Sequence, residues 1–145
     1  MTKTGPYALS MWRPWGLLTV TDRLTIPKNP ENRVNLHVGW RGDVYLHSGK
    51  RWDPVGAEAA EACGLSLVDD DVPTGYIGIA TLVDVHKDDG DKPCGCNRVW
   101  AEPGVWHWVW ENVRPFRTVV DLPGRQGLFR PDPTVVARTP ELLAV

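Results

Sequence analysis

The sequence predicts a small α+β domain in which β-structure predominates. Its 145 residues include 14 glycines and 13 prolines, which indicates many turns and short elements and argues against a helical bundle. Gly75–Val85 is long, largely apolar and rich in β-branched residues, as expected of a central strand. With 42% hydrophobic residues, the chain can bury the core of one domain, and we expect residues 1–145 to form it.

Two helices are predicted in the first half of the chain. Proline is favoured in a first helical turn, so a short helix is expected from about Pro14 to Asp22. Asp53 followed by Pro54 is a capping residue with proline at the first helical position, which predicts a helix to Cys63 with Gly64 as its terminator. This second helix is expected to cover the sheet.

Strands are predicted on either side of these helices. Tyr7–Met11 is apolar enough for a short strand. Asn32–Val38 and Asp43–His47 alternate polar and apolar residues around a turn at 39–42, which predicts a hairpin or an adjacent pair. In the central strand Gly78 and Ala80 are small, as a tightly curved barrel wall or the close approach of a ligand requires.

The second half of the chain is predicted as a long loop, then strands. Residues 86–103 are rich in Gly, Asp and Pro, whereas Val105–Trp110 alternates strictly. Pro115 is expected to end or bend that strand. The remaining predictions are short strands at Arg117–Leu122 and Gln126–Phe129, and a terminal turn or short helix at Pro140–Val145.

Charge is distributed unevenly along the chain. Residues 1–52 carry eight Lys/Arg and three Asp/Glu (+5), residues 53–91 one and ten (−9), and residues 92–145 seven and five (+2). A basic first third suits phosphate, but the net charge of −2 does not suggest tight non-specific binding to duplex DNA. A compact, local site is therefore expected.

The three cysteines bear on the compartment and on metal binding. An odd count with no signal-like start argues against a secreted disulfide framework, and no apolar run reaches the roughly 20 residues that span a bilayer. We therefore expect a soluble, cytoplasmic protein with no membrane partner. Cys94 and Cys96, with His86 or His107, are candidate zinc ligands, but zinc sites usually show two spaced pairs. The expectation is a reduced pair without stoichiometric metal, and no cofactor.

The stretch from Lys28 to Trp52 is the predicted ligand site. It holds five Lys/Arg against two acidic residues, with tryptophans and histidines between them. Pro27 and Pro30 argue against a helix there, so Lys28, Glu31 and Arg33 are expected on a loop. Binding groups are usually found on such loops, held by a rigid scaffold.

Several segments together resemble the ASCH domain family of the PUA-like superfamily. Lys28–Arg33, KNPENR, is similar to the family's K-x-x-E-N-R pattern, and the run from Arg41 to Lys50 is similar to its "RG, strand, H-A-G-K" run. The other matching pieces follow in family order between about residues 8 and 131: Leu9-Ser10, Arg13-Pro14-Trp15, Gly75–Ala80, Trp106–Val109, Asn112–Pro115 and Gly127–Phe129.

The resemblance implies a fold and a class of ligand. The fold is a small incomplete PUA-like β-barrel with short helices packed at the rim. The ligand is RNA, single-stranded DNA or a modified base, since relatives hold a modified base in an aromatic-walled pocket. Trp15 and Trp40 would stack on the base and Glu31 and Asn32 would read its edge. The rest of the predicted site is Lys28, Arg33, Arg41 and Lys50 for phosphate or sugar, together with His47.

Two other functions stay open. One branch of the family is an amidohydrolase on N4-acetylcytidine that uses a Lys, a nearby Thr and a later Glu; here Lys28 fits, but Glu31 stands at the expected threonine. Lys28 and Glu31 could also act as acid and base on a nucleotide, as in a nuclease. The third interpretation is a protein-protein adaptor. Frequent Ala, Gly, Pro, Arg and Trp suggest a GC-rich bacterial or phage genome.

Overall fold

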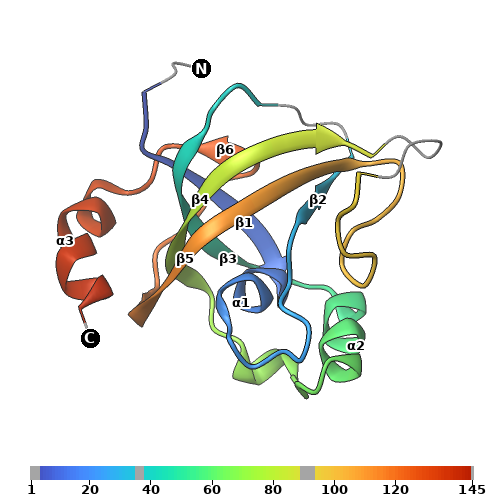
Figure 1. Cartoon of the computed structure of the whole chain (residues 1–145). Helices are drawn as coiled ribbons and strands as arrows, with labels where there is room; N and C mark the ends of the chain where they lie inside the picture. The colour runs from blue at the N-terminus through green and yellow to red at the C-terminus, as the bar shows by residue number, and fades with distance from the viewer. Residues whose placement is uncertain (1–3, 35–37, 89–93, 145) are drawn as a thin grey trace.

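The fold is a curled six-stranded mixed sheet, shaped like half a barrel, with three short helices around it (Figure 1). The computed structural model describes residues 4–34, 38–88 and 94–144. Its sheet order is β2-β5-β4-β3-β1-β6. The strands are β1 Tyr7–Arg13, β2 Glu31–Arg33, β3 Gly42–Trp52, β4 Gly75–Lys87, β5 Trp106–Val120 and β6 Leu128–Phe129. The helices are α1 Trp15–Val20, α2 Pro54–Ala62 and α3 Pro133–Leu143, with a 3-10 turn η1 at Asp69–Asp71.

Several predictions of local structure are confirmed. The predicted central strand is β4, which lies between β3 and β5 in the sheet. α2 begins where expected, because the Asp53 side chain accepts a hydrogen bond from the Val55 amide and Pro54 occupies the first turn. Gly64 follows the helix with a left-handed φ of +86°. These features were predictable because each depends on residues close together in the chain.

The predicted pairing of the second and third strands is wrong. β2 pairs with β5, placing Asn32 opposite His107, and β3 pairs with β1 and β4. β1 and β3 run parallel, with Leu9 opposite Leu46, and α1 and β2 lie in the crossover between them. The turn residues at 39–42 predicted that the chain changes direction there, but they did not predict which strands pair with each other. Residues 35–37 of the predicted strand Asn32–Val38 lie outside the described residues.

β5 continues through Pro115 to Val120 as one strand, so of the two alternatives predicted for Pro115 the one in which it ends the strand is wrong. The missing amide hydrogen of Pro115 is tolerated because the register of β4 against β5 shifts between Tyr76 and Gly78, next to its partner. β2 pairs only with Trp106–Trp108, so the rest of β5 has no strand on that side among the described residues. The separate strand expected from Arg117 is the end of β5.

Two expectations about helices are corrected. α2 does not cover the sheet: Ala60 packs with Leu18 of α1 and with Trp100 of the loop before β5. The C-terminal helix starts seven residues earlier than predicted, at Pro133, and contains Pro140. Asp132 caps it by accepting from the Thr134 amide, the same Asp-Pro arrangement that begins α2. No helix in the described ranges is long and apolar enough to cross a membrane.

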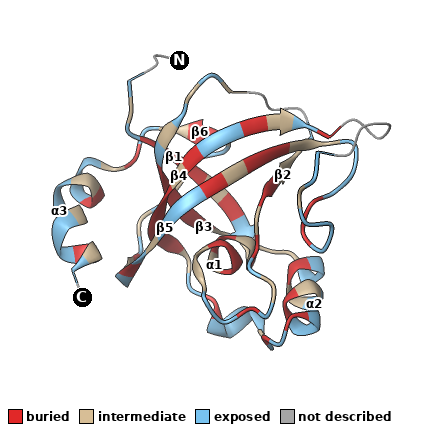
Figure 2. Cartoon of the chain, viewed as in Figure 1, coloured by how far each residue is buried: buried red, intermediate tan, exposed pale blue. Residues whose placement is uncertain are grey.

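The middle of β3 and the first half of β4 are buried on both faces, whereas parts of β4 and β5 further along are exposed (Figure 2). One face carries a cluster that includes Leu46, Leu82 and Trp108, and the other packs against α3 through Tyr45 and Val135. Alternate residues of β3 divide between these clusters, as the alternation from Asp43 to His47 predicted. Burial on both faces fixes the register of the central strands, because a one-residue slip would exchange the two clusters.

Gly75 offers a test of the β4–β5 register. A Cβ atom there would lie 2.3 Å from the Val120 carbonyl oxygen, and its φ is +124°, whereas Gly127 has a φ of +71° with no heavy atom within 4 Å of the added carbon. We expect Gly127→Ala to cost about 1 kcal/mol of backbone strain, and Gly75→Ala about 3 kcal/mol or more because the clash adds to the strain. Urea unfolding measures both. Equal losses would mean that β5 does not reach Val120 beside β4.

Candidate functional site

A groove of about 1320 Å³ opens beside α1, between β2, β3 and the segment that joins β5 to β6. It is the candidate functional site because it combines buried charges with aromatic walls. Its lining residues come from six stretches of the chain: Ser10–Trp12 with Trp15; Lys28 with Glu31–Arg33; His47–Arg51 with Asp53, Val55 and Ala59; Thr74; Val99 and Trp100 with Glu102; and Asp121–Gly127. The sequence brings none of these segments together by proximity alone.

A buried ion network forms the floor of the groove. The Lys28 ammonium is buried, donates to the Pro30 carbonyl at 2.9 Å and lies 3.4 Å from Glu31 Oε1. Arg33 Nη2 lies 3.1 Å from the other carboxylate oxygen of Glu31. Burial lowers the pKa of Lys28, and the attraction of Glu31 opposes this effect. When Lys28 is protonated, one carboxylate serves two cations and the network carries one excess positive charge.

Trp15 and Trp100 form an aromatic wall next to this network. Their rings meet edge to face with centroids 6.4 Å apart, and the Lys28 ammonium lies 5.5 Å from the Trp15 ring centroid. The Trp15 indole donates to Asp53 Oδ2 at 2.8 Å, and the Trp100 indole donates to the Ile26 carbonyl. Because each indole N–H has an acceptor, both rings are held in place before any ligand arrives.

His47 and Ser10 lie on neighbouring strands of the groove. His47 Nε2 donates to the Leu122 carbonyl at 2.8 Å, so Nδ1 is the acceptor for the Ser10 hydroxyl at 2.9 Å. Burial lowers the pKa of His47, and the Leu122 carbonyl and Asp121 oppose that effect. The ring is therefore neutral near pH 7. Gly124 can lie against the His47 ring because it has no side chain. A Cβ atom there would lie 2.5 Å from His47 Nδ1.

The exposed lining of the groove includes three cations. Lys50 and Arg51 are exposed at the end of β3, and Arg125 is exposed in the segment that joins β5 to β6. The Arg51 guanidinium stacks on Trp12 at 3.9 Å from the ring centroid, and Trp12 is 48% exposed. Glu102 and Asp121 are also exposed lining residues, so the exposed lining has three cations and two carboxylates and a net positive charge.

Two buried polar atoms in the groove have capacity for a ligand. The Ser48 hydroxyl and Arg33 Nε make no hydrogen bond to any residue within the part of the chain that the structure describes. Ser48 is fully buried and lines the groove. Buried polar groups are normally paired, so these atoms indicate that the groove accepts a polar partner, water or ligand.

The structure brings seven of the nine predicted ligand residues to the groove. These are Trp15, Lys28, Glu31, Asn32, Arg33, His47 and Lys50. Trp40 and Arg41 do not line it: Trp40 packs edge to face on Tyr7, and Arg41 donates to the Val38 and Trp40 carbonyls. The Asn32 side chain is engaged by backbone, donating to the Trp100 carbonyl and accepting from the Glu102 amide.

Sequence reasoning did not identify several groove residues. Ser10, Ser48, Trp100 and the Leu122–Gly127 segment are brought in by strand pairing and loop packing, which no local pattern shows. Arg51 lies within the stretch from Lys28 to Trp52 that was predicted as the ligand site, and Trp12 lies three residues before the predicted Trp15. Outside the groove, His86, Cys94, Cys96 and His107 form the group of side chains, among the described residues, that could hold a metal ion.

No protein-family model matches this chain, and no curated protein matches it either.

The ion network predicts an asymmetric pair of substitutions. Glu31→Gln leaves Lys28 buried without its carboxylate and should cost about 3 kcal/mol of unfolding free energy. Lys28→Met should cost only about 1 kcal/mol: it removes the contacts of Lys28 with the Pro30 carbonyl and Glu31, but no buried charge is left alone because Glu31 keeps Arg33. In the double variant the two costs should be far less than additive. Chemical denaturation measures all three proteins.

Glu111→Gln is the matched control, because Glu111 is exposed on β5 and should change stability by less than about 0.5 kcal/mol. An equal cost for Glu31→Gln and Lys28→Met, or strict additivity, would show that the three charges do not act as one network.

Proposed function

We propose that this protein is a binding module for single-stranded nucleic acid, RNA or DNA, or for a modified base within it, and that the groove is the binding site. The observation that carries the proposal is one cavity that combines fixed tryptophan walls, an exposed lining of net positive charge and two buried polar atoms without a partner among the described residues. Single strands are recognised by stacking on aromatic or guanidinium planes while cations contact the backbone.

The groove offers separate places for base and phosphate. The Arg51–Trp12 stack at the mouth presents a flat cation on an aromatic ring, on which a base can stack. The Ser48 hydroxyl and Arg33 Nε are closed to solvent, so a base edge would reach them only after the side chains that cover them move. Lys50 and Arg125 are exposed lining residues that can contact phosphates. Because these cations are few, the binding energy is local and a long duplex is not the expected ligand.

The resemblance to the ASCH family supports the same ligand class and a PUA-like assignment of the half-barrel. Within the residues that carry it, Lys28, Glu31 and Arg33 form the groove floor, and the run from Val44 to Lys50 contributes His47 and Lys50. The proposed site is narrower than the set expected from sequence, because it leaves out Trp40 and Arg41.

The buried position of Lys28 favours a second candidate, an amidohydrolase acting on an N4-acylated cytidine. Burial lowers the pKa of its ammonium, which increases the neutral amine available as a base. Glu31 lies beside it where the resemblance leads one to expect a hydroxyl nucleophile. Mass spectrometry of N4-acetylcytidine incubated with the protein tests this: product formation that Lys28→Met abolishes establishes the enzyme, and an unchanged nucleoside excludes it for this substrate.

Salt dependence tests the binding proposal. We expect fluorescence anisotropy to detect binding of short labelled single-stranded RNA or DNA, with the logarithm of affinity falling linearly against the logarithm of salt concentration. The double variant Lys50→Ala, Arg125→Ala should bind more weakly at low salt. Its slope should be shallower by about 0.7 for each phosphate that the variant no longer neutralises.

Two matched substitutions serve as controls because each also removes one positive charge. Arg138 is paired with Glu141 on α3, and neither it nor Arg41 lines the groove. Both single Ala variants should bind as the parent does. If Arg41→Ala weakens binding as much as the double variant, the ligand occupies the larger surface expected from sequence. If no oligonucleotide or modified nucleoside binds, the proposal is wrong.

A further inference from the structure

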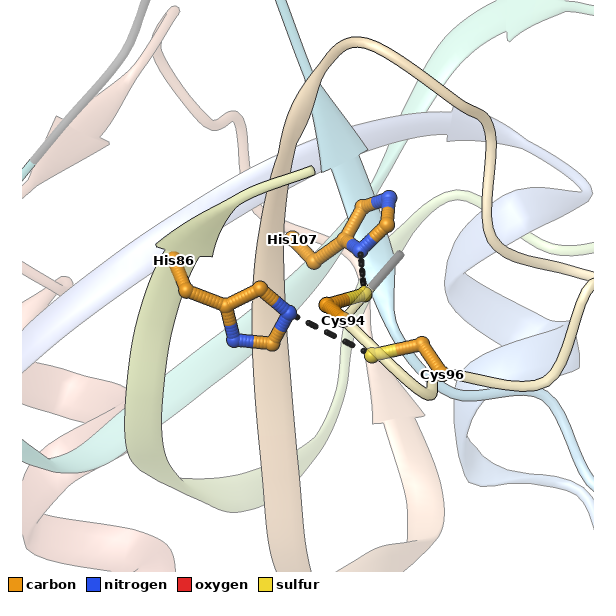
Figure 3. Close-up of side chains that lie close together, drawn as sticks. All are labelled: His86, Cys94, Cys96 and His107. Carbon is orange, nitrogen blue, oxygen red and sulfur yellow. Dashed lines mark hydrogen bonds between the residues drawn. The ribbon is translucent and has the colours of Figure 1, made fainter. Parts of the chain in front are cut away.

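Four potential metal ligands converge where the loop joins the end of β4 to the start of β5, separate from the groove (Figure 3). His86 and His107 are paired across the two antiparallel strands and project from the same side, with ring centroids 5.4 Å apart. Cys94 and Cys96 come from the loop that connects the strands. One ligand atom of each side chain lies within 4.8 Å of the other three.

The distances within this cluster approach those of a tetrahedral site. Cys94 Sγ lies 3.2 Å from His107 Nδ1, and Cys96 Sγ lies 3.4 Å from His86 Nε2. Zinc bonds of about 2.3 Å to sulfur and 2.0 Å to nitrogen give a nitrogen–sulfur separation of about 3.5 Å along the edge of a tetrahedron. A metal ion could thus be accommodated with shifts of a few tenths of an ångström on these edges.

The outer nitrogen of each imidazole is already held by an acceptor. His107 Nε2 donates to the Glu102 carbonyl at 2.6 Å, and His86 Nδ1 donates to Asp84 Oδ2 at 2.7 Å. Those two hydrogen bonds place the proton of each neutral ring on the side away from the cysteines. The lone pairs of His107 Nδ1 and His86 Nε2 are therefore directed towards the sulfur atoms, as in zinc sites whose histidines are oriented by a carboxylate or a carbonyl.

We propose that His86, Cys94, Cys96 and His107 bind one zinc ion as a closed, structural site. Two thiolates and two neutral imidazoles form a ligand set typical of tetrahedral zinc, and two thiolates balance its charge. Four protein ligands leave no position for a substrate, so the site organises the chain rather than catalysing a reaction. Asp84 is a positioning residue that orients His86.

A zinc ion at this site would restrict the movement of the loop between β4 and β5, which forms one wall of the groove. Asp88 anchors the start of that loop through a two-pronged pair with Arg98 and a hydrogen bond from the Gly104 amide. Trp100 of the same loop packs on Trp15 in the groove. Zinc at the cysteines adds a further attachment between these two points, so its removal should loosen the groove wall as well as lower stability.

From sequence alone the cysteines were expected to carry no stoichiometric metal, because Cys94 and Cys96 form one close pair rather than two spaced pairs. The second pair is provided by the register of β4 against β5, which brings His86 opposite His107. The geometry thus favours a bound zinc ion, which the spacing of the cysteines alone does not favour. The metal content of the protein decides between a zinc site and a metal-free pair of cysteines.

The first experiment is elemental analysis of tag-free protein from cells grown with added zinc, followed by cobalt substitution. We expect one zinc per chain, and for the cobalt protein the strong visible absorption of a tetrahedral ion with a thiolate charge-transfer band. Cys94→Ser and Cys96→Ser should each lower zinc affinity at least tenfold. These two positions are exposed or half-buried, so the variants should fold even where His107→Asn, at a fully buried site, does not.

Two controls separate this site from general effects. Cys63 is the remaining cysteine and lies in the core beside α2, so Cys63→Ala should retain one zinc per chain. Asp84→Asn should keep the stoichiometry but weaken affinity about 10-fold to 100-fold through the orientation of His86. Asp70→Asn, the same change in the exposed η1 turn, should have no effect on affinity.

Three results would overturn the proposal. They are only trace zinc with no tetrahedral cobalt spectrum, unchanged zinc in the double variant Cys94→Ser, Cys96→Ser, and a metal-free protein whose intact mass shows that Cys94 and Cys96 are joined by a disulfide. Each is read from the metal content, the spectrum or the mass, so none depends on whether the groove binds nucleic acid.

Discussion

The antiparallel pairing of β4 with β5 is the interaction on which the rest of this structure depends. The two strands are the longest in the sheet, and both of its hydrophobic clusters include residues from them. Their register places His86 opposite His107 at one end and Tyr76 opposite Val120 at the other. The same hairpin offers its outer edge to β2, which carries Glu31 and Arg33 to the groove. A slip of one residue would displace both sites together.

Alternation along β2 and β5 separates the two candidate sites. Glu31 and Arg33 project to the same side as Trp108, whose ring lies 5.9 Å from the Arg33 guanidinium. Asn32 and His107 are paired on the other side and bind the loop before β5. Neighbouring residues thus serve different purposes: one face supplies charge to the groove, and the other holds the loop that carries the cysteines.

Forming the groove costs folding free energy. The groove is for this reason a candidate functional site rather than a by-product of folding. Burying Lys28 with only one carboxylate shared between it and Arg33 stabilises the fold little, since desolvation offsets most of the attraction. The buried hydroxyl of Ser48 adds a further cost. A network of this kind is preorganised for a polar ligand, because the charges and the indole of Trp15 are held before binding.

The sequence by itself determined the elements whose causes are local. Asp53 and Pro54 begin α2, the β-branched run from Gly75 forms the central strand, and Lys28 and Glu31 lie three residues apart in a segment that proline keeps out of a helix. The Asp132-Pro133 pair contained the same information for α3. Most of the predicted ligand residues line the groove because they already lay in two short segments.

Only the tertiary structure decided which distant segments meet. It paired β2 with β5 instead of β3, excluded Trp40 and Arg41 from the groove, and placed two histidines around two cysteines. Strand partners are chosen by burial on both faces of the central strands and by loop closure over many residues, and no short pattern encodes that balance. Local residue types therefore determine which elements form, and packing determines which chemical groups they bring together.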